Sequence, residues 1–128
     1  MLRATLTLSL LAFCAIGLIA QDDLAQYQTW MKAAAGASGA ARGAVTAKDA
    51  AALSTQAKII EENFAHISAY WAKKQKDDAV KLSDTAKDAA KALGAATTPE
   101  EQAAAMQKLN GTCRGCHTVY RDGDKFKQ

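Results

Sequence analysis

The sequence predicts an all-α fold, in which four helices form an antiparallel up-down-up-down bundle. Alanine is the most frequent residue, and the single proline is Pro99. Apolar or small side chains recur at alternating steps of three and four in four stretches, which is the period of a helix that buries one face. The connections between these stretches are short, which favours antiparallel neighbours. We therefore expect helices near residues 22–46, 48–73, 77–94 and 99–122.

The first two helices are predicted from their apolar stripes. The stripe of the first comprises Leu24, Tyr27, Met31, Ala34, Ser38, Ala41 and Val45. That of the second comprises Leu53, Ala57, Ile60, Phe64, Ile67 and Trp71. Thr46 with Asp49 resembles a weak capping box. Gly36, Gly39 and Gly43 each weaken the first helix by about 1 kcal/mol relative to alanine, and we expect them to allow close helix packing.

The last two helices have clearer boundaries. The stripe of the third comprises Ala79, Leu82, Ala86, Ala89 and Leu93, and that of the fourth Met106, Leu109, Cys113, Cys116 and Tyr120. Gly94 is expected to end the third helix, and Gly123 follows the fourth. The string Thr98-Pro99-Glu100-Glu101 is a capping box with proline at the first helical position. The fourth helix therefore starts at Pro99 and carries both of its cysteines on the core-facing stripe.

Residues 1–20 have the layout of a secretory signal peptide. Arg3 precedes an apolar run from Leu6 to Ala20, and the sequence then turns polar. This run is shorter than the roughly 20 residues of a spanning helix, so a retained membrane anchor has less support. We expect cleavage near Ala20, a periplasmic location, no membrane association of the mature form, and a single mature domain of residues 21–128.

The string Cys113-Arg114-Gly115-Cys116-His117 is the attachment pattern of a c-type haem. Two thiols three residues apart lie on one helical face, where each can add to a haem vinyl group, and the next histidine can bind the iron. A zinc site needs four ligands, and His66 is the one other histidine. A thioredoxin-like pair belongs at a helix N-terminus. The motif thus predicts one covalent haem c, with Cys113 and Cys116 as anchors and His117 as proximal ligand.

The predicted topology places this haem at one end of the bundle. There the start of the first helix, the end of the second, the start of the third and the end of the fourth meet. The haem is expected to be lined by residues from the set Leu24, Tyr27, Trp30, Met31, Ile67, Tyr70, Trp71, Leu82 and Tyr120.

The sixth iron position separates two functions. Met106 lies on the helix of His117 and cannot reach the opposite haem face, so Met31 is the candidate distal ligand, although it also fits a plain core position. His66 falls off its stripe and is expected to face solvent. If neither Met31 nor His66 binds, the iron is five-coordinate and open to nitric oxide or carbon monoxide.

The charge and composition of the chain indicate few classes of partner. The net charge is +3, and no basic stripe with interleaved aromatics supports nucleic acid binding. No acid, base or nucleophile constellation suggests a substrate-converting enzyme. Removal of Cys14 with the signal peptide leaves two cysteines, both in the haem motif. Alanine- and glycine-rich helix faces are compatible with a homodimer but do not require one.

Over nearly its whole mature length the chain resembles the class II c-type cytochromes, the cytochrome c′ family. The most specific match is the run from Cys113 to Arg121, with a basic residue four positions after His117. The resemblance implies an exported four-helix bundle whose first helix supplies a distal residue, which falls at Met31, or at Lys32 if the comparison shifts by one. Arg121 lies one turn past His117, where it is either a contact to the proximal side or a propionate, or an exposed cation near a helix C-terminus. The family's arginine on the first helix is replaced here by Tyr27 or Gln28.

These observations together predict a periplasmic monohaem cytochrome that carries single electrons between redox partner proteins. The alternative is a five-coordinate haem protein that binds or sequesters a small gas. The redox potential, the partners and the oligomeric state stay open.

Overall fold

The computed structural model describes the backbone of residues 5–123 and 125–126 and the side chains of residues 23–123. Its elements are α1 (Thr5–Ala47), α2 (Ala50–Lys73), α3 (Asp77–Ala95), α4 (Pro99–Tyr120), β1 (Arg121–Asp122) and β2 (Lys125–Phe126). The predicted all-α class with four helices is confirmed. A two-residue antiparallel pairing of β1 with β2 was not expected, and it pairs Arg121 with Phe126.

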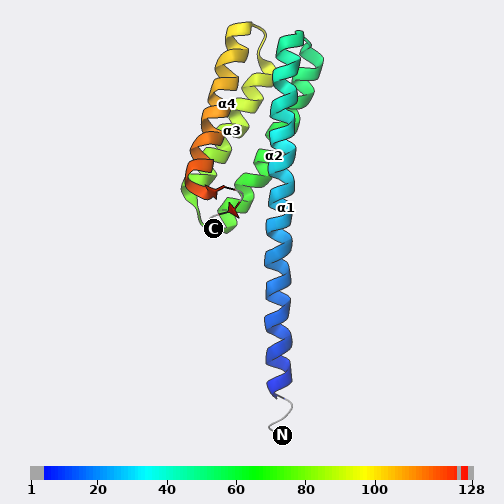
Figure 1. Cartoon of the computed structure of the whole chain (residues 1–128), viewed down its shortest axis with the longest axis vertical. Helices are drawn as coiled ribbons and strands as arrows, with labels where there is room; N and C mark the ends of the chain where they lie inside the picture. Colours follow the sequence, from blue (N-terminus) through cyan, green and yellow to red (C-terminus); the bar gives the residue numbers. More distant parts are fainter. Residues whose placement is uncertain (1–4, 124, 127–128) are drawn as a thin grey trace.

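The four helices pack into a bundle, but not equally on all sides (Figure 1). Close packing joins α1 to α2, α2 to α3, and α3 to α4, whereas α1 and α4 approach each other far less closely in the described part of the chain. Each well-packed pair is consecutive in sequence and joined by a short connection. The loosest side of the bundle is therefore the one between its first and last helices.

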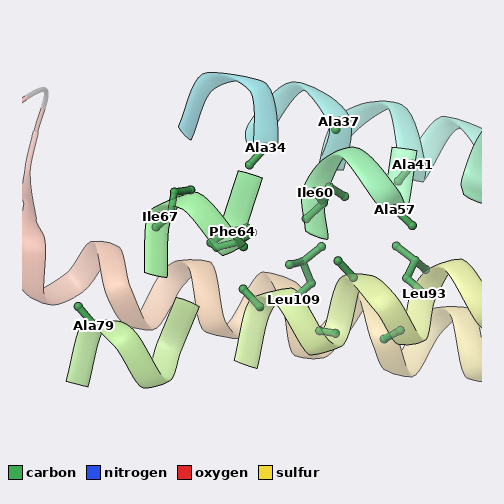
Figure 2. Packing of buried hydrophobic residues seen from close by; sticks show 14 of the residues in the cluster. Ala34, Ala37, Ala41, Ala57, Ile60, Phe64, Ile67, Ala79, Leu93 and Leu109 are labelled. Atoms are coloured by element: carbon green, nitrogen blue, oxygen red, sulfur yellow. The ribbon is translucent and has the colours of Figure 1, made fainter. Parts of the chain in front are cut away.

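The core is built mainly from alanine and aliphatic side chains that point to a common interior (Figure 2). Ile60, Leu93 and Leu109 are fully buried, and so are Ala41 and Ala79. Small side chains allow helix axes to approach closely, and the larger ones fill the remaining space at near-crystalline density. The predicted stripes therefore identify most of the core, but they miss other buried residues: Ala37, Ala44, Tyr70, Ala90 and Ala105.

Local capping fixes two helix starts. The Thr98 hydroxyl accepts a bond from the Glu101 backbone N–H, and the Glu101 carboxylate accepts one from the Thr98 N–H, each at 3.2 Å. The capping box predicted there is confirmed. At α2 the expected Thr46 capping box is wrong, because the Asp49 carboxylate accepts from the Ala52 N–H at 2.9 Å while the Thr46 hydroxyl donates to the Arg42 carbonyl.

Three expectations about glycine and helix ends need correction. Gly94 does not end α3, which continues to Ala95. A Cβ at Gly94 would lie 3.1 Å from the Ala57 Cβ, so glycine at this position lets α2 and α3 pack closely. Added Cβ atoms at Gly36, Gly39 and Gly43 would meet nothing within 4 Å, so these glycines do not serve close packing. The fourth helix ends at Tyr120, because Arg121 adopts extended backbone.

The helix α1 begins earlier than expected and continues beyond the bundle at its N-terminal end (Figure 1). The predicted signal peptide, residues 1–20, lies outside the residues whose side chains the structure describes. Among the described residues, no helix is both long enough and apolar enough to cross a membrane.

Candidate functional site

The three residues of the haem motif lie on the last turns of α4. Cys113, Cys116 and His117 are each half-buried, and both thiols are free and pack against the hydrophobic core. Gly115, between them, faces Leu82 of α3 at ordinary contact distance for an added Cβ. Both thiols therefore lie against the core, as the stripe predicted, and His117 lies at a cavity wall.

A cavity of about 530 Å³ borders this motif in the gap between α1 and α4. Met31 of α1 and His117 of α4 both line it, together with Cys113. A second void, of about 20 Å³, is lined by the same three residues and also by Cys116 and Ile67. The larger volume falls within the range of about 300–1,000 Å³ typical of ligand sites. Met31 and His117 therefore share the wall of a cavity that is large enough for a ligand.

An aromatic cluster, defined here as Tyr27, Tyr70, Trp71 and Tyr120, lies beside the motif. Tyr27 and Tyr70 have ring centroids 4.4 Å apart, and Trp71 lies 4.5 Å from Tyr120 by the same measure. All four side chains are buried. The cluster brings α1, α2 and α4 together and places apolar rings near the motif, where they exclude water.

The aromatic cluster is tied to α3 by a short hydrogen bond. The Tyr120 hydroxyl donates to the Asp78 carboxylate at 2.6 Å, which joins the end of α4 to the first turn of α3. This bond is the main reason why the pKa of Asp78 lies below its ordinary value and that of Tyr120 rises to about 12. The bond fixes the helix end that carries His117.

Burial sets the protonation of the motif. It is the main cause that raises the pKa of the Cys113 thiol and raises that of Cys116 to about 11. Thioredoxin-like pairs have lowered thiol pKa values at helix N-termini, so both position and protonation disfavour that role. Burial, followed by the charge of Arg121, lowers the pKa of His117. A neutral imidazole, the form that binds metals, is therefore favoured at neutral pH.

The sequence-predicted site residues divide into three groups. Tyr27, Met31, Ile67 and Arg121 line one or both cavities with the motif. Trp71 and Tyr120 belong to the aromatic cluster instead. Trp30 lines neither cavity and stacks on the exposed His66, with ring centroids 5.0 Å apart.

Two polar residues of the larger cavity were not predicted from the sequence. The Arg42 guanidinium of α1 donates from Nη2 to Asn110 Oδ1 of α4 at 2.7 Å, and both residues line the larger cavity. Helical spacing contains the signal. Arg42 follows Met31 by eleven residues and Asn110 precedes His117 by seven, or about three and two turns at 3.6 residues per turn, so each pair shares a face. The predicted stripes contain only apolar or small residues, so they include neither Arg42 nor Asn110.

Comparisons with known proteins found no matching family model, no matching curated protein and no matching solved structure. Among the described residues there is also no group of three or more His, Cys, Asp or Glu side chains arranged to hold a metal ion directly.

Proposed function

We propose that this protein is a periplasmic monohaem c-type cytochrome of the cytochrome c′ family that transfers single electrons. The observation that carries the proposal is that the Cys113–His117 motif lines a cavity with Met31 on the facing helix. The proposed bundle has the antiparallel up-down-up-down order favoured by its short connections. In this proposal the signal peptide, residues 1–20, is removed, and residues 21–128 form the mature domain.

The donor set of the site fits a covalently attached haem. Two reduced thiols on one helical face can each form a thioether, and an adjacent neutral histidine can occupy one axial position. When bound, the haem supplies reversible one-electron chemistry. The chain anchors it through Cys113 and Cys116, orients it through His117, and excludes water with the buried aromatic cluster.

Met31 is the residue best placed to act as the distal ligand. It lines both cavities together with His117, whereas Lys32 lines only the larger one. His66 is exposed and stacked on Trp30, away from the motif. A thioether ligand favours ferrous iron and raises the reduction potential, which suits an electron carrier.

A second candidate function is the binding or sequestration of a small gas by a five-coordinate haem. The observation that favours it is the small-residue wall of the cavity on the α1 side, where Ala34, Ala35 and Gly39 leave room next to Met31. Met31 is flexible, and a side chain turned away from the iron would leave this space to nitric oxide or carbon monoxide.

Mass and absorption measurements on the exported, matured protein test the proposal. We expect the mass increment of one haem and a low-spin ferrous spectrum that does not respond to carbon monoxide. A colourless product without added mass contradicts the haem assignment. A high-spin spectrum that shifts with carbon monoxide contradicts Met31 ligation and supports the gas function.

Two methionine variants sharpen this experiment. Met31→Ala is expected to convert the low-spin spectrum into one that responds to carbon monoxide. Met106→Ala removes the same side chain from a half-buried position that lines neither cavity, and it is expected to leave the spectrum unchanged. Equal spectra for the two variants would remove Met31 from the site.

A further inference from the structure

The larger cavity has a charged wall that the Cys-x-x-Cys-His motif does not explain. Its described lining includes the cations Lys32, Arg42 and Arg121 and contains no carboxylate. Within the part of the chain with described side chains, Arg42 takes part in no ion pair. A cavity wall that carries cations and no carboxylate favours an anionic group on its ligand.

We propose that Arg42, oriented by Asn110, binds a propionate of the haem. This inference rests on the proposed function, because it names the residues that receive one part of the cofactor. A haem brings two carboxylates, and each pyrrole that bears a propionate adjoins one that bears a vinyl group. Attachment through Cys113 and Cys116 therefore keeps one propionate on the Cys113 side of the ring.

Arg42 lies on that same side of the cavity. Its partner Asn110 precedes Cys113 by three residues, so the two side chains are neighbours on the surface of α4. The charge of Arg42 also counteracts the effect of burial on the pKa of Cys113. Both observations place the guanidinium close to the first attachment point.

The bond between Arg42 and Asn110 leaves suitable donors for a carboxylate. Arginine carries five N–H donors in a planar fork, and Asn110 accepts from Nη2. Because the Asn110 oxygen is the acceptor, its amide N–H groups are further donors. Asn110 thus acts as a positioning residue that holds the guanidinium at the cavity wall, so that less side-chain entropy is lost on binding.

The test follows the reduction potential of the holoprotein as a function of pH. Loss of the Arg42 charge is expected to lower the potential and to raise the apparent pKa of the propionate by about one unit, because a cation nearby stabilises the ionised carboxylate. Arg42→Gln should show both effects, together with a shift of the propionate Raman band. Arg42→Lys, which retains the charge without the fork, should shift the Raman band but largely preserve the apparent pKa.

Controls separate this inference from general charge effects. Lys91→Gln removes one exposed charge from α3 and should change neither the reduction potential nor the apparent pKa of the propionate. Asn110→Ala should give the same direction as Arg42→Gln with a smaller shift, because it loosens the guanidinium without removing its charge. Arg42→Gln behaving like Lys91→Gln, or Lys32→Gln alone producing the full shift, would overturn the assignment. A wild-type protein without covalent haem would refute the proposed function itself.

Discussion

The α2–α3 seam and the α1–α4 gap use similar small residues but differ in packing. At the seam, Ala57, Ala86 and Ala90 are fully buried or nearly so. Gly94 has no Cβ to press against Ala57, so α2 and α3 can approach closely. At the gap, Ala35 and Gly39 stay exposed and line the cavity. The contrast teaches that small residues permit close approach but do not enforce it.

The difference follows from chain connectivity and from what spans each interface. A three-residue connection, Lys74–Lys76, joins α2 to α3 and keeps them adjacent, whereas α1 and α4 are separated along the chain by two other helices. A polar contact from Arg42 to Asn110 bridges the gap. A polar bridge of this kind can hold two helices at a distance that leaves room for a ligand.

The largest expected effect comes from removing the thiols at the gap. The double variant Cys113→Ser, Cys116→Ser should lose covalent haem completely, because serine cannot form the thioether bonds, while circular dichroism should still report a helical protein. Thr112→Ser, a control from the same turn of α4, should keep the full haem mass. Covalent haem in the double variant would contradict the assigned attachment.

Two glycine positions allow the gap to be compared with a solvent-exposed face of α1. Gly39→Leu places a side chain at the cavity wall and is expected to lower the fraction of haem-bearing protein severalfold, as judged by mass spectrometry. Gly43→Leu lies one turn further along α1, does not line the cavity, and is expected to leave haem incorporation unchanged. Equal incorporation in both variants would mean that the cavity does not receive the haem.

The same substitution at the seam should act on stability instead. Gly94→Leu forces a side chain against Ala57 and is expected to destabilise the fold by roughly 1–3 kcal/mol through overpacking. Gly43→Leu meets open space and should stabilise α1 by about 0.5–1 kcal/mol through higher helix propensity. Denaturant unfolding measures both, and a stabilised Gly94→Leu would show that the seam has spare room.

The smallest expected effect concerns the bond that ties α4 to α3. In the folded state the pKa of Asp78 lies below its ordinary value of 3.8, so the stabilisation is complete above that value and is lost as pH falls through the folded pKa. The pKa of Tyr120 rises from 10 to about 12, so stability is also lost as pH rises through that interval. Tyr120→Phe should lower the melting temperature in the pH range between the titrations of Asp78 and Tyr120. Below the folded pKa of Asp78, the melting temperatures of the variant and the wild type should converge.

Tyr70→Phe is the matched control for this bond. The Tyr70 hydroxyl makes no hydrogen bond to the described side chains. The melting temperature of Tyr70→Phe should therefore fall with acid as that of the wild type does, so that the difference between the two proteins stays constant. An acid limb that persists unchanged in Tyr120→Phe would contradict the role of the Asp78 bond.

The sequence by itself determined that the chain forms four helices and that the Cys-x-x-Cys-His motif lies near the end of the fourth. A helical stripe is a local pattern, so Leu53 to Trp71 marks a buried face whatever lies opposite. Thr98 and Glu101 cap α4 through bonds that reach only three residues, and these too are local. The placement of Cys113, Cys116 and His117 on one inward face follows from helical spacing alone.

The tertiary structure decided which interfaces close. Nothing in the local sequence distinguishes Gly94, which faces Ala57, from Gly39, which faces the cavity, because the neighbour that gives each glycine its role lies on another helix. The same holds for Trp30, which stacks on His66, and for Arg42, whose partner Asn110 is 68 residues away in the sequence. Contacts between distant segments depend on how whole helices settle against one another, and that balance is set only when all the faces are packed together.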